Sequence, residues 1–404
     1  MKKAHQLKLY PTKSQMVLLN KSFGVARHSY NWALSKWKEL YDQGQNPSAY
    51  TLIKIQNSIK REEMPFYLEV SKCAPQYAIH NLEKAYKNMW NGLAKYPKFK
   101  KKGRRDSFVS VENSQNFKQK NKKIWCPRIG WIKCSENLRF EGKVNSVTVK
   151  RVAGMYFAVI NIDVPNPAPT LKPINGENQA IVGVDLGIKT MAVLSDGVTF
   201  ENPKALKNNL KSLRRQQKSL SRKVRGSNNY HKQRIKVARK HYEISCIRNN
   251  AINQMTSFVV KNYDTIVIES LKPKNMVKNR CLALAVSDVS FGEIARQLVY
   301  KSEWHGKELI KVDTYFPSSK MCSNCGNKKS ELKLSERTYK CENCSLEIDR
   351  DLNAAINLAN YGTTHKSGGS YACGEDVSLS NKLSSEKQEV NILNNNSVLK
   401  YTEN

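Results

Sequence analysis

The stretch MCSNCGNKKSELKLSERTYKCENCSLEIDRDLNAAINLANYG (321–362) contains four cysteines and, soon after them, an aspartate that opens a helical pattern. The cysteines form two Cys-x2-Cys pairs with fifteen residues between them: Cys322, Cys325, Cys341 and Cys344. Each pair presents two thiolates to one tetrahedral ion, and the intervening length suits a short hairpin that closes the site. Asp351 follows seven residues after Cys344. The spacing therefore predicts a small zinc module inserted just before a carboxylate at a helix start.

Disulfides and chance are the alternatives to zinc. The chain opens MKKAHQLKLYPTK (1–13), without the apolar run of a secretory signal, so disulfides are disfavoured and a reducing, intracellular compartment is expected. Four thiolates fill the coordination sphere of zinc and leave no position for water, so we expect the zinc to be structural. The remaining cysteines lack this spacing and are expected to be reduced thiols: Cys73, Cys126, Cys134, Cys246, Cys281 and Cys373.

The composition indicates a polyanionic partner. The 404 residues include 68 Lys and Arg against 34 Asp and Glu, a net charge of +34. A surplus of this size opposes compaction unless a polyanion neutralises it, and a chain of this length suggests roughly two to four domains. An anionic membrane surface is the alternative, but the basic residues are interleaved with aromatic ones, which favours nucleic acid. No apolar run reaches the roughly 18 residues of a membrane span, so a spanning protein is excluded.

The N-terminal region has the apolar spacing of helices. A short alternating strand over 1–10 precedes helices that we expect over 12–42, 50–60 and 75–93. The character changes at the basic loop YPKFKKKGRRDSF (96–108), which leads into short alternating stretches typical of a small sheet or barrel. Residues 166–179 are rich in Pro, Gly and Asn and predict a linker.

The C-terminal region alternates strands and helices. The pattern predicts a β-hairpin at AIVGVDLGIKTMAVLSDG (180–197), strands at DTIVIESL (264–271) and ELIKVDTYF (308–316), and a helix over 291–306. Residues 204–248 carry fifteen Lys and Arg and a single acid, and their apolar residues have helical spacing with a turn at RGSNN (225–229). A solvated helix face normally mixes charge signs to gain ion pairs, so this helical pair is predicted to contact nucleic acid.

Three carboxylates lie at the ends of these elements: Asp185 in a strand beside glycine, Glu269 at the end of a second strand, and Asp351 at a helix start. Bringing them together is unfavourable without cations, because like charges raise each other's pKa. Two Mg2+ ions resolve the repulsion and create a centre that cleaves phosphodiesters, one activating water and one stabilising the leaving oxygen. Each acid also has a simpler interpretation, respectively a turn residue, a solvated strand end and a helix N-cap. Asp349 competes with Asp351 for that cap.

Four segments carry a family resemblance: VGVDLGIKTMAVLSDG (182–197), IVIESLKPKNMVKN (266–279), YFPSSKMCSNCG (315–326) and DRDLNAAINLANYG (349–362). They resemble the successive blocks of the TnpB (OrfB) family of transposon-encoded proteins, which are relatives of the type V CRISPR effector nucleases. The resemblance covers residues 1–375 and rests on independent motifs in the right order. It implies an α/β nuclease domain of RuvC/RNase H-like type with an inserted zinc ribbon, preceded by a helical recognition lobe and a small β-barrel.

The resemblance and the composition together imply the domain bounds. We expect a wedge-like β-barrel domain from 1–10 and 96–165, a helical recognition domain over 11–95, a linker over 166–179, a nuclease domain from 180–320 and 346–362 with basic helices over 204–260, a zinc ribbon over 321–345, and a disordered tail over 363–404. Ser345 stands where the family usually has glycine, so the turn after Cys344 is expected to be less relaxed, although metal binding should survive.

By the resemblance, Asp185, Glu269 and Asp351 match the catalytic, magnesium-binding positions of the family. The implied activity is RNA-guided cleavage of double-stranded DNA beside a short adjacent motif, with a guide RNA from the transposon end. The protein would help to retain the element rather than perform transposition. Pairing with the guide reads the sequence, while the protein holds the nucleic-acid backbone in basic channels. We expect a monomer bound to RNA, in a prokaryotic cytoplasm with the nucleoid, and no membrane partner.

Lys72 and Gln76 lie four apart near a helix start and resemble the family positions that read the adjacent motif, since Gln pairs with an adenine edge and Lys with guanine or phosphate. The alternative is that Lys72 contacts phosphate and Gln76 faces solvent. Tyr50 is a further candidate, and the basic candidates are Lys100, Lys101, Arg104, Arg214, Arg215, Arg222 and Arg225. Tyr86 and Trp90 have helical spacing and are expected in the core.

Three other functions are compatible with parts of this pattern. A nuclease-inactive, guide-directed DNA-binding repressor would have the same architecture but would have lost a carboxylate, and all three carboxylates are present. A protein-only transposase or nuclease predicts cleavage without RNA. A bare zinc-ribbon transcription factor leaves the acidic residues and most of the chain unexplained.

Overall fold

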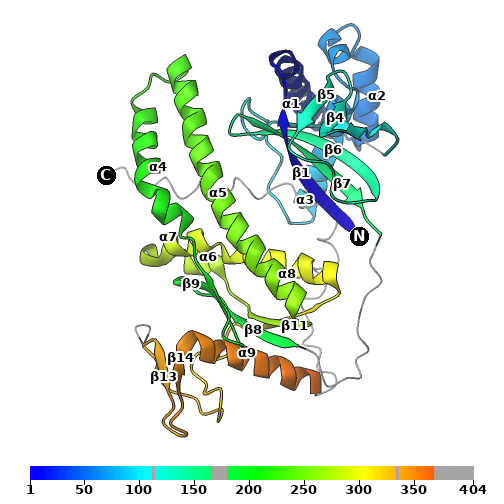
Figure 1. Ribbon diagram of the computed structural model, residues 1–404. Helices are drawn as coiled ribbons and strands as arrows, with labels where there is room; N and C mark the ends of the chain where they lie inside the picture. The colour runs from blue at the N-terminus through cyan, green and yellow to red at the C-terminus, as the bar shows by residue number, and fades with distance from the viewer. Residues whose placement is uncertain (112–113, 166–179, 334–335, 368–404) are drawn as a thin grey trace. The chain divides into compact units, whose positions relative to one another are not determined.

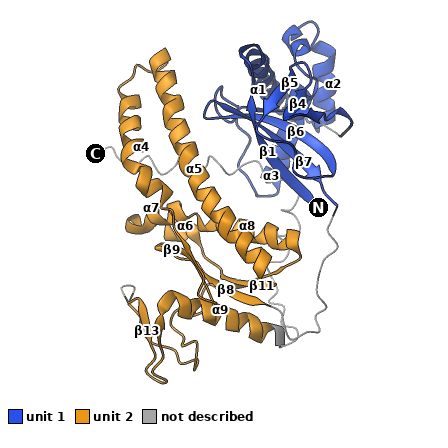
Figure 2. Ribbon diagram, viewed as in Figure 1, with its two compact units in different colours: residues 1–165 blue, residues 166–404 orange. Residues whose placement is uncertain are grey.

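The computed structural model describes residues 1–111, 114–165, 180–333 and 336–367. The chain divides into two compact units, residues 1–165 and 166–404 (Figure 2). The linker predicted over 166–179 and the tail beyond residue 367 lie outside the described residues. Within the described ranges, no helix combines the length and the apolar character that crossing a membrane requires.

The first unit contains an antiparallel sheet with the N-terminal strand at its centre. Its strand order among the described residues is β2-β6-β7-β1-β5-β4-β3. The strands are β1 (Lys2–Tyr10), β2 (Ser107–Val111), β3 (Gln119–Lys120), β4 (Lys123–Cys126), β5 (Gly130–Cys134), β6 (Lys143–Val152) and β7 (Met155–Asp163). β1 pairs with β7 on one side and with β5 on the other. No pairing joins β2 to β3 in the described part of this unit, so the barrel stays a prediction.

The helices of the first unit follow the predicted apolar spacing. They are α1 (Lys13–Asp42), α2 (Ala49–Ile59), the 3-10 helix η1 (Pro65–Glu69) and α3 (Cys73–Trp90). A capping box starts α1, because the Thr12 hydroxyl accepts a hydrogen bond from the Gln15 N–H and the Gln15 side chain accepts one from the Thr12 N–H. Phe23 of α1 packs edge-on against Phe108 of β2 with ring centroids 5.3 Å apart. Helices and sheet therefore share one hydrophobic core.

Two aromatic residues of α3 have different environments. Tyr86 is buried, as predicted, and stacks on Trp37 with ring centroids 4.6 Å apart. Trp90 is 60% exposed, so its predicted place in the core was wrong. The reason is its position, since α3 ends at Trp90 and the ring lies at the outer edge of the stack that Trp37 and Tyr86 form.

The second unit is built on a mixed five-stranded sheet with the order β10-β9-β8-β11-β12. The strands are β8 (Ile181–Asp185), β9 (Thr190–Leu194), β10 (Thr199–Glu201), β11 (Thr265–Glu269) and β12 (Glu308–Val312). β8, β11 and β12 run parallel, whereas β9 is antiparallel to both β8 and β10. The antiparallel pairing of β8 with β9 confirms the predicted hairpin. The parallel strands are near-continuous apolar runs, as expected where helices cover both faces.

Helices cover both faces of this sheet (Figure 1). They are α4 (Ala205–Ser221), α5 (Asn228–Asn262), α6 (Pro273–Met276), α7 (Arg280–Val289), α8 (Phe291–His305) and α9 (Arg350–Ser367). Ile266 and Ile268 of β11 belong to the hydrophobic cluster of α5 and α8. Val267, which points to the opposite face, packs with Leu358 of α9. The helices α6 and α7 were not predicted, and α9 continues five residues beyond the predicted start of the tail at 363.

The cysteine module precedes α9 and contains the short strands β13 (Thr338–Lys340) and β14 (Glu347–Asp349), which pair antiparallel. The hairpin predicted between the two cysteine pairs falls on a segment whose residues 334–335 lie outside the described residues, so it stays a prediction. The strands β13 and β14 enclose the second pair, because the Cys341–Cys344 segment is itself the turn of the hairpin. An isolated bridge between Met321 and Lys328 encloses the first pair in the same way.

Candidate active site, metal centre and nucleic-acid interface

Two of the three predicted carboxylates end neighbouring parallel strands. In the pairing of β8 with β11, Val184 lies opposite Ile268, so Asp185 and Glu269 occupy the next position on each strand. Both side chains are half-buried. Parallel strands place their carboxyl ends at one edge of the sheet, which is where α/β folds form their sites. The strand pairing alone therefore brings these two acids together.

Gly183 lets the helix that carries the third carboxylate approach the sheet. A Cβ atom at Gly183 would lie 1.9 Å from the Ala355 carbonyl oxygen and 2.5 Å from the Ala359 nitrogen, both in the backbone of α9. The backbone of β8 at Gly183 therefore packs directly against the backbone of α9, at a point where Ala355 is fully buried. Gly362 packs closely too, because a Cβ there would lie 2.6 Å from the Val267 Cγ2 atom. The absence of side chains at these positions sets how near α9 comes to β8.

The N-terminus of α9 is capped by Asp349, which leaves Asp351 available. The Asp349 Oδ1 atom accepts hydrogen bonds from the N–H groups of Asp351 and Leu352 at 2.9 and 3.0 Å. Asp349 is thus the N-cap of α9, a choice between Asp349 and Asp351 that the sequence did not decide. The Asp351 side chain is half-buried in the first turn of the helix.

Electrostatics shows that the three acids interact. Burial raises the pKa of Asp185 most, and the charges of Glu269 and Asp351 raise this pKa further, to about 8, against the opposing effect of Arg350. In the described residues, the three carboxylates do not form a group whose oxygen atoms all lie within 4.8 Å of one another. Repelling, half-buried carboxylates of this kind are the oxygen ligands that Mg2+ prefers, so the donor set fits a divalent cation.

A serine that the sequence analysis did not identify holds one of the acids. The Ser318 hydroxyl donates a hydrogen bond to Oε1 of Glu269. The Ser318 carbonyl oxygen accepts a hydrogen bond from Nδ2 of Asn357 at 2.7 Å, and the same Nδ2 donates to the Met321 carbonyl at 2.7 Å. Asn353, one turn earlier in α9, also donates to Met321 at 2.7 Å. The signal that could have found the asparagines is their i, i+4 spacing on the buried face of α9.

The four cysteine sulfurs gather with the geometry of a metal site. All four Sγ atoms lie within 4.8 Å of one another. The Cys322–Cys344 and Cys325–Cys341 Sγ distances are 3.6 and 3.5 Å. These distances are too long for a disulfide, whose S–S length is about 2.05 Å. They approach the ~3.8 Å expected between thiolates around a tetrahedral zinc with Zn–S bonds of ~2.3 Å, so the residues fit zinc.

The two cysteine knuckles share one backbone design. The Cys322 N–H donates to the Asn327 carbonyl at 2.9 Å, and the Cys341 N–H donates to the Leu346 carbonyl at 2.8 Å. The residue after the second cysteine has a left-handed conformation in both, with a φ of 73° at Gly326 and 57° at Ser345. The predicted strain at Ser345 therefore corresponds to an observed positive φ. Hydrogen bonds from the Asn327 N–H and the Asn343 side chain lower the pKa of Cys325 to about 6, which favours the thiolate that binds metal.

The predicted basic helical pair is present as α4 and α5. Arg214, Arg215, Arg222 and Arg225 are all exposed, on α4 or in the turn that follows it. Within the described ranges, none of these four arginines forms a salt bridge. A basic surface without acidic partners is the electrostatic footprint of a site for phosphates.

An aspartate of the unpredicted helix α7 fixes this helical pair. Asp288 is 4% exposed. Its carboxylate accepts hydrogen bonds from the Leu206 N–H at 2.9 and 3.0 Å and from the Lys207 N–H at 3.1 Å, which caps α4. It also pairs with the Arg248 guanidinium of α5 at 3.1 Å. One buried carboxylate thus joins α4, α5 and α7.

Lys72 and Gln76 line a cavity of about 520 Å³ in the first unit. Lys72 is exposed at the start of α3, and Gln76 is half-buried one turn later. The lining also includes Trp125 and Arg128, from β4 and the turn after it. Tyr50 is 78% exposed and is not among the residues that line this cavity. The structure therefore groups Lys72 with Gln76 and separates Tyr50 from them.

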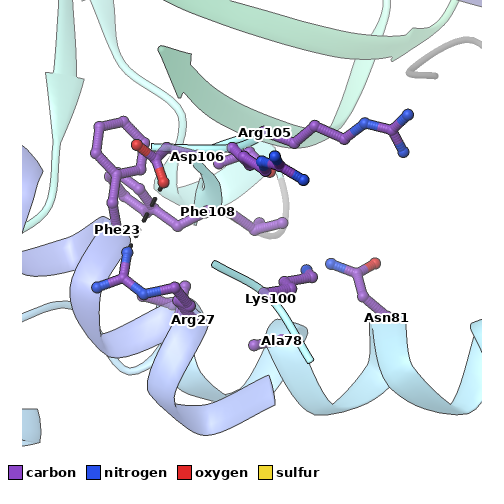
Figure 3. Close-up of a pocket in the computed structure, with 13 residues that line it drawn as sticks. Phe23, Arg27, Ala78, Asn81, Lys100, Arg105, Asp106 and Phe108 are labelled. Carbon is purple, nitrogen blue, oxygen red and sulfur yellow. Dashed lines mark ion pairs between the residues drawn. The ribbon is translucent and has the colours of Figure 1, made fainter. Parts of the chain in front are cut away.

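Lys100 and Arg104 line a second, smaller cavity of about 20 Å³ (Figure 3). In the same lining, Arg27 pairs with the buried Asp106 at 3.8 Å. The Asp106 carboxylate also accepts a hydrogen bond from the Gly103 N–H at 3.2 Å, which fixes the basic loop. Lys101 is exposed and lies outside this lining. The cavity has room for one atom group of the size of a phosphate oxygen.

Family models match three segments of the chain. The OrfB_IS605 model, described as "Probable transposase", matches residues 160–280. A Cas12f1-like TNB domain model matches residues 291–358, which contain the cysteine module, and a helix-turn-helix domain model matches residues 1–46.

Known proteins resemble the chain over most of its length. Two are named "Putative RNA-guided DNA endonuclease": one from Streptomyces pristinaespiralis, 34% identical over 93% of this chain and 92% of the relative, and InsQ from Escherichia coli K12, 30% identical over 96% and 98%. A solved structure, the "Cryo-EM structure of the Cas12f1-sgRNA-target DNA complex", has 17% identity and a TM-score of 0.54 and covers 86% of this chain and 82% of that one. This last likeness shows a shared fold. The chain therefore belongs to the OrfB (TnpB) family of transposon-encoded proteins.

Proposed function

We propose that this protein is an RNA-guided double-stranded DNA endonuclease of a transposon, which cuts beside a short adjacent motif. The observation that carries the proposal is the cluster of Asp185, Glu269 and Asp351 at one edge of the second sheet. The names of the two relatives that are at least 30% identical support it, and so does the fold shared with Cas12f1 in a complex with sgRNA and target DNA.

The acidic cluster is proposed to be a RuvC-like, RNase H-type centre that uses two Mg2+ ions. The carboxylates of Asp185, Glu269 and Asp351 would hold the ions, which would supply an activated water and a stabilised leaving oxygen. Asp349 takes the helix cap and leaves the Asp351 carboxylate free for this role. With its pKa raised to about 8, Asp185 would hold a proton near neutral pH in the metal-free protein, and a cation bound by this carboxylate would compete with that proton. Cation binding should therefore tighten as the pH rises.

The cysteine module is proposed to be a zinc ribbon with a purely structural role. Four thiolates complete a tetrahedral zinc site and leave no ligand position for water. The module leads into α9 without an intervening loop, because β14 ends at Asp349 and α9 begins at Arg350. Zinc is thus expected to stabilise the segment on which Asp351 depends.

The partners are proposed to be a guide RNA from the transposon end and the double-stranded target, bound by one protein chain. The arginines of α4 and the following turn would contact backbone phosphates, and Lys100 and Arg104 would bind a phosphate at the small cavity of Figure 3. Lys72 and Gln76 would face base edges from the larger cavity, which has the volume to admit them. Guide pairing would then supply the sequence specificity.

The proposal is tested by cleavage of a plasmid library with one fixed target and randomised flanking bases. The protein is co-expressed with the flank of its transposon, so that the guide is present. We expect cleavage that requires Mg2+, is lost after RNase treatment and in Asp185→Asn, and enriches one short flank. The matched control is Glu201→Gln, which changes an exposed carboxylate at the end of the edge strand β10 and should cleave like the wild type.

The other outcomes separate the alternatives. Cleavage that survives RNase would favour a protein-only nuclease. Flank-specific binding without cleavage by the wild type would favour a repressor. Cleavage by Asp185→Asn at the wild-type rate would remove the acidic cluster from the chemistry.

A further inference from the structure

We propose that Ser318 and Asn357 are positioning residues that fix the Glu269 carboxylate to the zinc ribbon, so that the acidic centre attains its cation-binding geometry through the ribbon. This inference rests on the proposed function, because it assigns a role toward the same carboxylate cluster. It assigns roles to two residues outside the acidic cluster and the cysteine set, and it connects that cluster to the cysteine module through hydrogen bonds.

The first link is the hydrogen bond between Ser318 and Glu269. Ser318 lies in the FPSSK segment (316–320), between the end of β12 and the first cysteine, and it is 4% exposed. Its hydroxyl donates to Oε1 of Glu269. A donor of this kind holds one carboxylate oxygen and leaves the other free for a cation, so it selects the orientation of the side chain. Glu269 follows a buried strand, and a fixed rotamer there determines where its free oxygen lies.

The second link is Asn357, which fixes the backbone of Ser318. Asn357 is 1% exposed, and its Nδ2 atom donates to the carbonyl oxygens of Ser318 and Met321, both at 2.7 Å. Buried carbonyls without a donor are costly, so these two bonds determine the path of the FPSSK segment. Because α9 carries Asn357 as well as Asp351, one rigid helix positions Asp351 directly and Glu269 through Ser318.

The third link reaches the zinc ribbon. Met321 directly precedes Cys322, and its carbonyl oxygen also accepts a hydrogen bond from Asn353, at 2.7 Å. The Asn353 Oδ1 atom in turn accepts the Ser323 N–H at 3.0 Å, inside the first knuckle. Asn353 is 0% exposed. The chain of contacts therefore runs from the knuckle through Asn353, Met321 and Asn357 to Ser318 and ends on Glu269.

The test compares Ser318→Ala with Ser319→Ala in the full-length protein bound to its guide RNA. Ser319 is the adjacent serine, half-buried and without a hydrogen bond to Glu269, so it controls for loss of a hydroxyl in the same segment. Three quantities are measured. The first is the Mg2+ concentration that gives half of the maximal single-turnover cleavage rate. The second is the Mg2+ concentration that gives half of the Mg2+-induced increase in Tm of the zinc-loaded protein, and the third is the affinity for target DNA in EDTA. The second and third need no cleavage.

For Ser318→Ala, we expect both Mg2+ midpoints to rise about 10- to 100-fold, because removal of a group that orients a metal ligand typically weakens cation binding by that factor. Zinc content, target binding in EDTA and the Tm in EDTA should equal those of Ser319→Ala. Asn357→Ala should show the same Mg2+ shift together with a lower Tm. Thr364→Ala should show neither, because this exposed position of α9 directs its hydroxyl to the Asn360 carbonyl within the helix.

Two results would overturn the inference. One is a Ser318→Ala protein whose Mg2+ midpoints match those of Ser319→Ala. The other is an activity loss that no Mg2+ concentration restores and that accompanies a lower Tm in EDTA, which would make Ser318 structural only. The proposed function fails separately, if Asp185→Asn still cleaves. If Asp185→Asn is inactive while Ser318→Ala behaves as the wild type, only the positioning inference fails.

Discussion

Replacing Gly183 by alanine should separate α9 from the sheet and thereby move Asp351 away from Asp185. The new Cβ atom would lie 1.9 Å from the Ala355 carbonyl oxygen, whereas real Cβ atoms essentially never approach closer than 3.0 Å. Because the neighbour is backbone and no rotamer can relieve the clash, α9 has to retreat by roughly 1 Å. Overpacking of this kind costs about 3 kcal/mol of unfolding free energy, and a 1 Å displacement of a catalytic group costs about 100-fold in rate.

The assay is urea unfolding of the zinc-loaded protein together with single-turnover cleavage by the guide RNA complex. Two other glycines calibrate it. The three atoms nearest to a Cβ at Gly362 belong to side chains rather than to backbone, with a Val267 methyl group at 2.6 Å, so we expect an intermediate loss for Gly362→Ala. Gly292→Ala in α8 has nothing within 4 Å and should be neutral or slightly stabilising. Wild-type cleavage and stability in Gly183→Ala, or a loss no larger than that of Gly292→Ala, would refute the reasoning.

Three further predictions concern charge, backbone strain and a buried ion pair. Between about pH 4 and 8, the folded metal-free protein keeps a proton on Asp185 that the unfolded chain has released, so the stability of the protein falls as the pH rises through this window. In EDTA at pH 7.5, the free energy of unfolding of Asp185→Asn should exceed that of the wild type by about 2 kcal/mol, and a difference independent of pH would contradict this. Ser345→Gly relieves the strain of a φ of 57° and should raise the free energy of unfolding of the zinc-loaded protein by about 1 kcal/mol, whereas Gly326→Ala, at a φ of 73°, should lower it by about the same amount. Urea unfolding with zinc present measures both changes, and equal effects of the two substitutions would contradict this prediction. Asp288→Ala leaves the Arg248 charge buried and the start of α4 uncapped, so unfolding should need about 3 kcal/mol less and guide RNA binding should weaken, and a loss below about 1 kcal/mol would show that the pair is dispensable.

The sequence predicted the features that periodicity and spacing encode. The basic helical pair has a period of 3.6 residues, and the β8–β9 hairpin and the strand that ends at Glu269 are short apolar runs of β-branched residues; both patterns are local in the sequence. The four cysteines were found from spacing because two tight knuckles and one tetrahedral ion leave little freedom. The roles of the three acids stay predictions, although the strand register and Gly183 explain why they lie together.

The features that the sequence did not predict depend on contacts between distant segments. Ser318 and Asp288 are polar residues without a distinctive pattern, and their importance appears only when the partner carboxylate or N–H group is known. The i, i+4 spacing of Asn353 and Asn357 marks a polar pair on a buried helix face, but it does not identify the carbonyl groups that they bind. The choice between Asp349 and Asp351 as the cap was undecidable from spacing, since both residue types favour that position. The short helices α6 and α7 have few periodic residues between Pro273 and Val289, which is too little for a periodicity argument.

The long helix α5 is one continuous, rigid element. It has 35 residues, and all of its buried residues lie from Ile244 onward, so the preceding 16 residues (228–243) extend beyond the core of the sheet. At 1.5 Å per residue this outer half is about 24 Å long, roughly the rise of seven base pairs. No glycine or proline interrupts the helix, so it has no hinge at which the outer half could bend independently. Anything bound along the outer half is consequently held at a fixed offset from the edge of the sheet where Asp185 lies.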